Sequence, residues 1–373
     1  MTSGQTAVPG AAQSAPASPA AAAPIRTRLT DLTGIRYPIV QTGMGFVAGA
    51  RLAAATSKAG GLGIIGSATM TLDALRIAID EVKERTDAPF GVNLRADAPD
   101  AAERLELMIA GGVRVASFAL APRREQIERL KDAGLIVIPS VGARRHAEKV
   151  AQWGADGVIV QGGEGGGHTG PIPTSLLIPQ VVSSVDIPVV AAGGFFDGRG
   201  LVAAMAYGAE GIAMGTRFLL TSDSPVADAV KQVYLAKTLT DTVVTTRVDG
   251  VPHRVLRTPL IEGLESSGPV AGLVRAVRNA AAFRTLSRLT WRQLVREGIA
   301  MRRGSELSWS QVLMAANTPM LLKAAMVDGR PDLGVMAAGQ VVGLIDDVPS
   351  CAELIQRVMA QAHDCLARLS GRE

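Results

Sequence analysis

The chain has 373 residues, of which 47% are hydrophobic and only 3% aromatic. Its 38 Lys and Arg residues against 34 Asp and Glu residues leave a formal net charge of +4, a small excess for this length. This composition argues against nucleic-acid binding, which draws on aromatic platforms and dense positive charge. No uncharged apolar run reaches about 18 residues, which argues against a membrane span.

The first 25 residues are rich in Ala, Pro, Ser and Gly. They contain neither a basic start nor a continuous apolar stretch, so they do not resemble a secretory signal. This composition is typical of a disordered segment. We therefore expect a disordered tail over residues 1–25 and a folded region from residue 26.

Short apolar runs alternate with amphipathic stretches from residue 38 to about 235. The runs are continuous, which is typical of parallel strands covered on both faces. Eight such units predict a TIM (β/α)8 barrel over residues 26–240, an α/β fold. An open doubly wound sheet is the alternative, because a count of strands does not show that the sheet closes. The predicted strands are 38–44, 62–68, 90–94, 113–120, 135–141, 157–163, 188–194 and 211–219.

Residues 60–66, GGLGIIG, have the spacing G-x-G-x-x-G of a dinucleotide-binding loop. In that motif the glycines follow a strand and open a helix. Here a helix comes first, and residues 62–65 belong to the strand itself. A tight turn between a helix and a strand is the better interpretation.

The stretch GGEGGGHTG, residues 162–170, follows the sixth predicted strand. An ordered glycine costs up to about 1 kcal/mol relative to alanine, so a cluster suits backbone that takes positive φ or touches a ligand. A flexible surface loop is the alternative. Histidine as a residue type titrates near neutrality, so the ring of His168 can take a proton from a carbon acid while a cofactor accepts electrons. Glu164 either orients His168, acts as a second acid or is a solvated loop residue.

Glycines also end the last two predicted strands, at Gly193 and Gly194 and at Gly215, which Thr216 follows. Loops after the last strands of a barrel can direct backbone N–H groups at a phosphate, and glycine permits close approach. Ordinary turns are the alternative. Asn93, at the end of the third predicted strand, either contacts a cofactor ring or caps a turn.

The pattern changes after residue 236. Residues 243–258 look extended and loop-like, and helical patterns dominate from about 270 to 370, including 307–326. We expect residues 241–373 to form an extended segment and a C-terminal helical cap on the substrate side of the barrel. Arg288 and Arg292 belong to a run of arginines spaced four residues apart. This run either binds the phosphates of an acyl-CoA or is a solvated helix face.

The remaining histidines, His146, His253 and His363, are expected to have structural roles, with His253 the least certain of them. Cys351 and Cys365 show no C-x-x-C spacing and no neighbouring histidine cluster. Neither a disulfide framework nor a metal site is therefore expected. This cysteine usage indicates a reducing, cytoplasmic compartment.

The segments PIVQTGM, FGVNL, VQGGEGGGHTG, AAGGF and AMGTRFL, in this order, resemble the nitronate monooxygenase family over roughly residues 28–265. The resemblance implies a TIM barrel that holds FMN, with His168 as a base or substrate-binding group. A flavin enoyl-reductase branch shares this barrel, so the family does not settle the reaction. The chain departs from the pattern at Thr42-Gly43, where Ala-Pro is expected, so the pocket facing the flavin can differ. The implied cofactor-binding residues are Gln41, Gly43, Met44, Asn93, Gly193, Gly194, Gly215 and Thr216, with Gln161, Gly166 and Gly167 as further candidates.

Residues 248–258 and 307–324 resemble more closely an actinobacterial branch that acts in steroid ring catabolism. That resemblance implies dehydrogenation of a hydroxylated methyl-hydrindanone carboxyl-CoA, with a new double bond α,β to the thioester and NAD⁺ as the electron acceptor. Our hypothesis is that His168 abstracts the α-proton. The alternatives are a nitronate monooxygenase, which uses oxygen and a nitro compound, and a non-catalytic barrel that binds FMN or acyl-CoA. The sequence does not predict an oligomeric state.

Overall fold

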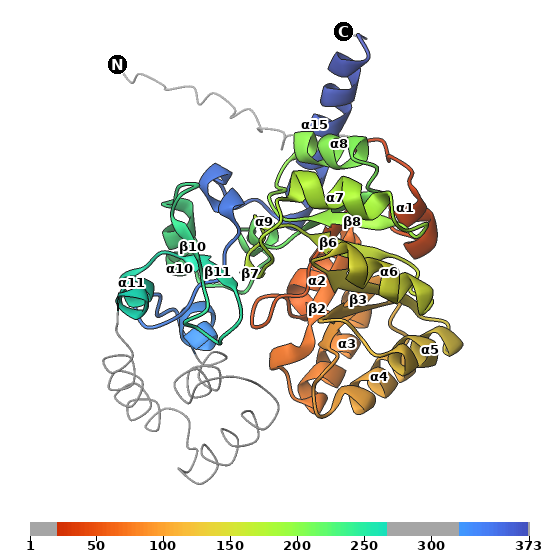
Figure 1. The fold of residues 1–373 in the computed structure, drawn as a ribbon, viewed down its shortest axis with the longest axis horizontal. Helices are drawn as coiled ribbons and strands as arrows, with labels where there is room; N and C mark the ends of the chain where they lie inside the picture. The colour runs from red at the N-terminus through yellow and green to blue at the C-terminus, as the bar shows by residue number, and fades with distance from the viewer. Residues whose placement is uncertain (1–20, 267–320, 372–373) are drawn as a thin grey trace, which may run out of the picture.

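A computed structural model describes residues 21–266 and 321–371 (Figure 1). Eight parallel strands close into a barrel in the order β1-β2-β3-β4-β5-β6-β8-β9. The predicted TIM barrel is therefore confirmed, and the open sheet is excluded. The strands are β1 (Ile39–Gln41), β2 (Leu62–Gly66), β3 (Phe90–Arg95), β4 (Val115–Ala119), β5 (Ile136–Val141), β6 (Val158–Gln161), β8 (Val189–Ala192) and β9 (Gly211–Met214).

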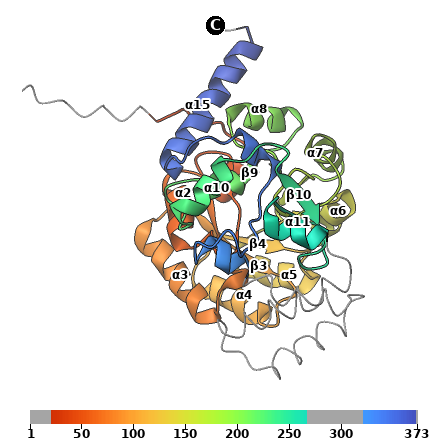
Figure 2. The same ribbon diagram turned by 90° about the vertical axis from the view of Figure 1, so that its left-hand side faces the viewer.

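Helices surround the barrel, as Figure 2 shows for α2 to α8. Their starts are set by local capping: the side chain of Thr71 accepts a hydrogen bond from Ala74 N at the start of α3, and that of Asp197 accepts one from Gly200 N at the start of α8. The helices are α1 (Arg28–Thr33), α2 (Ala50–Lys58), α3 (Leu72–Arg85), α4 (Ala101–Ala110), α5 (Arg124–Asp132), α6 (Arg144–Gln152), α7 (Thr174–Val182), α8 (Gly198–Ala206), α9 (Thr216–Leu219) and α10 (Asp228–Leu235), with the short 3₁₀ helix η1 (Ser67–Thr69).

The strands bury both faces, which explains their continuous apolar sequences. Ile64 belongs to a cluster with Val40, Val115 and Val190 from other strands of the barrel. Its neighbour Ile65 belongs to a second cluster, which includes residues of the surrounding helices. Successive side chains of one strand thus enter two different cores, as the alternation of side chains along a strand requires.

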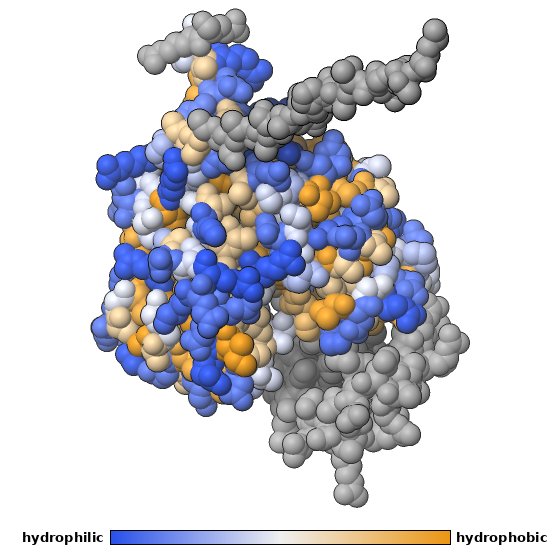
Figure 3. All heavy atoms as spheres, turned by 180° about the vertical axis from the view of Figure 1, so that it is seen from behind, coloured by the Kyte–Doolittle hydropathy of each residue, from blue (hydrophilic) through white to orange (hydrophobic). Residues whose placement is uncertain are grey.

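The outer surface in Figure 3 intersperses hydrophilic and hydrophobic residues. Among the helices that the structure describes, none is long and apolar enough to cross a membrane.

The structure can be compared with the sequence predictions at two glycine-containing segments, residues 60–66 and 211–219. The turn at residues 60–66 is confirmed: α2 precedes it, Gly60 has φ +96°, and β2 begins at Leu62. The eighth predicted strand, 211–219, is wrong at its end, because β9 stops at Met214 and residues 216–219 form α9. Hydrophobicity alone does not distinguish such a short buried helical turn from a strand.

Residues 243–258 are extended, as expected, and they form a hairpin of β10 (Thr242–Thr245) and β11 (His253–Leu256). The hairpin is followed by α11 (Pro259–Glu265). β11 also pairs with β7 (Gly167–His168), which lies within the glycine-rich stretch. A small sheet of order β10-β11-β7 therefore joins this hairpin to the loop that follows β6.

The C-terminal region contributes to the same core as the barrel. The long helix α15 (Cys351–Leu369) lies beside α8 and α2 (Figure 2). Ile355, Val358 and Met359 join the main hydrophobic cluster. The 3₁₀ helix η2 (Gln340–Leu344) precedes α15. Most of the predicted helix 307–326, and all of the arginine run that contains Arg288 and Arg292, lie outside the described residues.

The segment before α1 also packs on α15. Ala22 N donates a hydrogen bond to Oε1 of Gln356 at 2.7 Å, and its carbonyl accepts one from the hydroxyl of Tyr37 at 2.9 Å. Residues 21–25, which we expected in the tail, are therefore held against the folded chain, and residues 1–20 are not described.

Gly198→Ala is expected to destabilise the contact between α8 and α15. A Cβ atom at Gly198 would lie 2.3 Å from Ala362 N and 2.3 Å from Val358 O, both backbone atoms of α15. Because the backbone can give way only if the helices separate, we expect the free energy of unfolding to fall by about 1–3 kcal/mol or more. Urea denaturation measures this change.

The matched control is Gly142→Ala. The nearest atom to a Cβ at Gly142 is 3.9 Å away, and its φ is not in the left-handed region. Its effect should stay within about 0.5 kcal/mol, as for an ordinary surface substitution. Equal stabilities of the two variants would contradict the tight packing at Gly198.

Candidate active site

Three segments that are distant in sequence meet beyond the C-terminal ends of the strands, the end where TIM barrels carry their active sites. They are the glycine-rich loop 162–170, the β10–β11 hairpin and residues 335–340. Gln340 N donates to the carbonyl of Glu164 at 3.0 Å, and Val255 forms an antiparallel bridge with Ala337. The loop therefore lies between the hairpin and the C-terminal segment.

Close packing explains several of the loop glycines. A Cβ atom at Gly166 would lie 2.5 Å from Gly339 N, and one at Gly165 would lie 2.6 Å from Nε2 of Gln161. Gly167 has φ +76°, a conformation that favours glycine. The glycine cluster thus belongs to a packed loop and not to a flexible surface loop. Cofactor contacts of Gly166 and Gly167 remain predictions.

Polar side chains hold the loop in place. Gln161 donates from Nε2 to the carbonyl of His168 at 2.8 Å. Arg254 donates from Nη2 to the carbonyl of Gly163 at 2.9 Å and from Nη1 to Oγ1 of Thr242 at 3.0 Å. Burial lowers the pKa of Arg254, and the charge of Glu164 acts in the opposite direction. The backbone on both sides of His168 is therefore fixed before any ligand binds.

Glu164 has a capping role. Its Oε2 accepts hydrogen bonds from the backbone N of Thr174 at 2.8 Å and from Oγ1 of Thr174 at 2.5 Å, at the start of α7. Neither hydrogen bond involves His168. Of the interpretations weighed for Glu164, orientation of His168 is therefore not what the structure shows, and the carboxylate is bound to protein rather than solvated.

His168 is hydrogen-bonded to Asp249. Its Nε2 lies 2.7 Å from Oδ2 of Asp249, which is located in the turn between β10 and β11. The side chain of His168 is 54% exposed, whereas that of Asp249 is 12% exposed. Burial raises the pKa of Asp249, but its contacts with His168 and His253 outweigh this and hold that pKa well below its usual range.

This geometry assigns the two nitrogens of His168. Because the ionised Asp249 can only accept, Nε2 of His168 carries the hydrogen and donates it. Nδ1 of the neutral ring is then unprotonated and free to accept a proton. The arrangement is the orienting carboxylate and imidazole base found in many hydrolytic and oxidative sites.

His253 lies in a strand and not in a loop, although its role stays a prediction. We expected a structural role for it in a loop, but it lies in β11 directly opposite His168, and the two ring centroids are 4.6 Å apart. Its Nδ1 lies 3.5 Å from Oδ2 of Asp249 and has no hydrogen-bond partner among the described residues. Sequence reasoning also missed Asp249, since an aspartate in a turn is ordinarily solvated and only the hairpin pairing brings it to His168.

The ends of β8 and β9 offer unpaired backbone donors. Gly193 and Gly194 have φ of +99° and +84°. Their N–H groups and that of Gly215 donate no hydrogen bond to any residue that the structure describes. Thr216 follows, and its Oγ1 accepts a hydrogen bond from Gly339 N at 3.0 Å. Gly193 and Gly215 are half-buried and Gly194 is exposed, so these amides are accessible to a ligand. Accessible, unpaired amides on neighbouring strands suit a phosphate, because backbone N–H groups can be directed at an anion.

Other predicted flavin contacts gather at the same end of the barrel. A Cβ at Gly43 would lie 2.4 Å from Cβ of Asn93, so the absence of a side chain at Gly43 makes room for the asparagine. Asn93 donates to Oγ of Ser117 at 3.2 Å. The atoms nearest to a Cβ at Gly215 belong to the side chains of Thr42 and Met44. Gly43 and Met44 follow β1, Asn93 belongs to β3 and Gly215 follows β9, so these residues meet at one rim.

Gln41 is used within the barrel. It is fully buried, and its Nε2 donates to the carbonyl of Ile64 at 3.1 Å while its Oε1 accepts from Ile64 N at 3.3 Å. Its side chain therefore continues the pairing of β1 with β2 beyond the last backbone pair. A flavin contact through this amide remains a prediction, with its polar atoms already bonded to protein.

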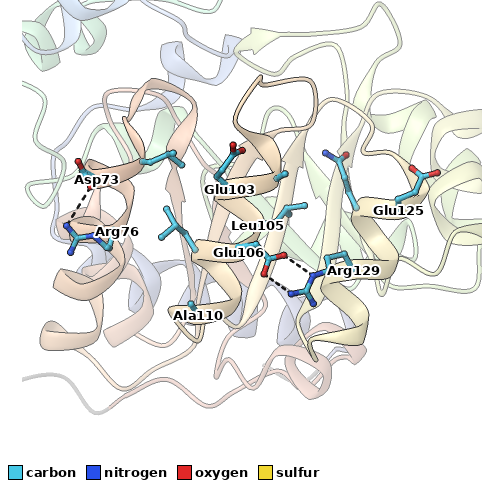
Figure 4. A pocket seen from close by; sticks show the side chains of 12 residues that line it. Asp73, Arg76, Glu103, Leu105, Glu106, Ala110, Glu125 and Arg129 are labelled. Atoms are coloured by element: carbon cyan, nitrogen blue, oxygen red, sulfur yellow. Dashed lines mark hydrogen bonds and ion pairs between the residues drawn. The ribbon is translucent and has the colours of Figure 1, made fainter.

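A surface pocket of about 850 Å³ lies elsewhere, between α3, α4 and α5 (Figure 4). Its walls include the ion pair of Arg129 with Glu106, at 2.7 Å. None of the predicted site residues lines it. This pocket is therefore separate from the candidate active site.

The remaining histidines and cysteines have structural environments. His146 lies on α6, where burial lowers its pKa, and Nε2 of His363 on α15 lies 2.8 Å from the carbonyl of Ala23. Cys351 and Cys365 are free thiols. Burial raises the pKa of Cys351 to about 12, so this thiol is not a nucleophile at neutral pH.

Comparison with known proteins adds three findings. A family model described as nitronate monooxygenase matches residues 26–361. Proteins named (3aS,4S,5R,7aS)-5-hydroxy-7a-methyl-1-oxo-octahydro-1H-indene-4-carboxyl-CoA dehydrogenase are 65% identical over 341 residues in Mycobacterium tuberculosis and 61% identical over 338 residues in Rhodococcus jostii, each match covering 91% of this chain and 96% of the relative. The solved structure of FabK from Thermotoga maritima superposes with a TM-score of 0.75 at 36% identity, covering 94% of this chain and 100% of that one.

Proposed function

The chain belongs to the nitronate monooxygenase family, and from this premise we propose that it is an FMN-dependent acyl-CoA dehydrogenase of steroid catabolism. The proposed substrate is the 5-hydroxy-7a-methyl-1-oxo-octahydro-indene-4-carboxyl-CoA thioester, and the product has a double bond α,β to the thioester. The observation that carries the proposal is the pair of His168 and Asp249, at 2.7 Å, beside unpaired backbone amides that suit a flavin phosphate.

The relatives support the choice of substrate. Two curated relatives named for this thioester match 91% of the chain at 61% and 65% identity. Relatives named as probable nitronate monooxygenases, such as the one from Staphylococcus saprophyticus, match 64% of the chain at 35% identity. The length and closeness of the first match favour the acyl-CoA substrate over a nitro compound.

The base in this reaction is Nδ1 of His168. The carbon next to a thioester is a carbon acid, and the exposed ring of His168 can reach a ligand that lies above the barrel. Asp249 holds Nε2–H and stabilises the imidazolium that forms when Nδ1 takes the α-proton. FMN, when bound, supplies the acceptor for the β-hydride. The substrate thus loses one proton and one hydride, which leaves the double bond.

The residues present fit FMN. The amides of Gly193, Gly194 and Gly215 offer hydrogen-bond donors without partners among the described residues. Gly193 and Gly194 have positive φ, and because glycine has no Cβ, a phosphate can approach their backbone closely. Met44 and Asn93 lie at the same rim and would adjoin the ring system. NAD⁺ as the final electron acceptor and a cytoplasmic location, in keeping with two free thiols, complete the proposal.

Gly215→Ala is expected to lower the affinity for FMN about tenfold or more. A Cβ at this position would lie 3.2 Å from Oγ1 of Thr42 and 3.5 Å from Sδ of Met44, so the fold tolerates it with a small adjustment. It would, however, keep a phosphate from approaching the backbone, and a loss of about 1.4 kcal/mol is a factor of ten. Flavin content after dialysis against FMN measures the effect, with Gly142→Ala as the control. Full flavin content in Gly215→Ala would show that the flavin phosphate does not bind at Gly215.

The test of the function is an anaerobic absorption spectrum of the purified protein before and after addition of the hydroxy-methyl-hydrindanone carboxyl-CoA thioester. Bleaching of the oxidised flavin band, restored by NAD⁺, is expected. A yellow protein that the thioester does not reduce but a nitronate does would be a monooxygenase. A colourless protein that takes up no added FMN would overturn the flavin proposal.

A further inference from the structure

The cluster of His168, Asp249 and His253 has a feature that the proposed reaction does not use. Within the described ranges, it is the one group of His, Cys, Asp and Glu side chains found with the arrangement of a metal site, with the three ligand atoms all within 4.8 Å of one another. We propose that it binds a divalent transition-metal ion of the Zn²⁺ class through Nε2 of His168, Oδ2 of Asp249 and Nδ1 of His253.

The buried side of the site is preformed. The side chains of His253 and Asp249 are 5% and 12% exposed and are held by the β10–β11 hairpin. Nδ1 of His253 faces Asp249 at 3.5 Å and has no hydrogen-bond partner among the described residues. A buried nitrogen without a partner costs free energy, and a cation between it and the carboxylate would satisfy both.

Small movements complete the geometry. Zinc binds imidazole nitrogen and carboxylate oxygen at about 2.0–2.2 Å, so neighbouring ligand atoms of a tetrahedral site lie about 3.3 Å apart. The present separations are 2.7 Å from Asp249 Oδ2 to His168 and 3.5 Å from it to His253. The exposed side chain of His168 would supply most of the movement that brings the three ligand atoms, now within 4.8 Å of one another, to these separations. The fourth ligand position then faces solvent, which gives the ion a way in.

The chemistry of the donors selects the ion. Two imidazoles and one carboxylate suit Zn²⁺ and related transition metals, whereas Mg²⁺ and Ca²⁺ prefer oxygen ligands. Asp249 supplies one negative charge. Arg95, whose charge acts on Asp249, is itself paired with Asp97 at 2.7 Å. Because Asp97 already balances the charge of Arg95, Arg95 would not strongly repel a Zn²⁺ ion at Asp249.

Metal binding would also affect His168 as the base. This consequence rests on the proposed function, whereas the metal site itself does not. A metal ion on Nε2 of His168 displaces the hydrogen from that atom, and the neutral ring then carries its hydrogen on Nδ1. Nδ1 cannot then accept the α-proton. Zn²⁺ is expected to inhibit the dehydrogenase reversibly, and EDTA is expected to restore it.

The experiment is isothermal titration of the full-length, EDTA-treated protein with ZnCl₂, without substrate. One site per chain with a micromolar or lower Kd is expected. His168→Gln, which changes an exposed side chain, and Asp249→Asn should each weaken binding at least tenfold. The control His146→Gln, on α6, should bind as the wild type does. No binding below about 1 mM Zn²⁺, or unchanged affinity in both His168→Gln and Asp249→Asn, would overturn the site.

A second measurement separates this inference from the proposed function. Co²⁺ in place of Zn²⁺ gives visible absorption bands that report nitrogen and oxygen ligands in the protein whatever reaction it catalyses. Bands that vanish in His253→Gln with its circular dichroism unchanged would support the three-ligand site. Because both measurements omit substrate, a protein that failed to dehydrogenate the thioester would leave the metal site standing.

Discussion

His168→Ala is expected to lower the rate of flavin reduction by the acyl-CoA thioester about 100- to 10,000-fold while the protein keeps its FMN. This is the range by which a positioned general base accelerates proton transfer. The ring of His168 is 54% exposed, so its removal opens no cavity in the core. Anaerobic stopped-flow measurement of flavin absorbance gives the rate of the chemical step directly.

The matched control is His146→Ala on α6, which removes an imidazole that makes none of the contacts described for the site and should leave the reduction rate unchanged. Flavin content and circular dichroism of both variants show whether fold and cofactor are retained. A His168→Ala protein with normal flavin content that is reduced at the wild-type rate would eliminate His168 as the base.

Asp249→Asn is expected to slow the same step about 100-fold or more. The carboxylate accepts from Nε2 of His168 at 2.7 Å and balances the charge of the imidazolium. An amide carries no charge, and it can turn its NH₂ group toward Nε2 and so favour the tautomer with hydrogen on Nδ1. The base is then present but wrongly protonated. Single-turnover flavin reduction measures the loss, with Asp132→Asn on α5 as the control.

A structural effect of Asp249→Asn is distinguished by the state of the ring. Nitrogen NMR of labelled protein reports which nitrogen of His168 carries the hydrogen, and we expect it on Nε2 in the wild type. The double variant should be no slower than His168→Ala, because the two side chains act as one unit. If the two substitutions lowered the reduction rate additively, Asp249 would not act through His168. The same would follow if a slow Asp249→Asn protein kept the hydrogen on Nε2 of His168.

The sequence determined the strands of the barrel because the signal of each strand is local. Strands covered on both faces require continuous apolar runs, and each of the eight predicted segments overlaps one strand of the barrel. The error at residues 216–219 has the same origin: a buried helical turn and a strand end have the same hydrophobicity over so few residues. His168 was visible because it stands in a glycine-rich segment that follows a strand.

The partners of His168 were decided by tertiary structure. Asp249 is 81 residues away in the chain, and its turn reaches His168 only because β11 pairs with β7 in the register that sets His253 opposite His168. Nothing in the local sequence of the hairpin records this register. The same holds for Gly166, whose missing side chain makes room for the backbone of Ala338 and Gly339.

Sequence alone thus specified which segments are strands, where glycine allows close approach and which ring can move a proton. It left open whether the sheet closes, which carboxylate orients the ring and which atoms fill the space beside the glycines. The first set depends on the burial and conformational preference of single segments, which residue type records directly. The second depends on contacts between residues far apart in the chain, and these exist only after strand register and packing have placed them in space.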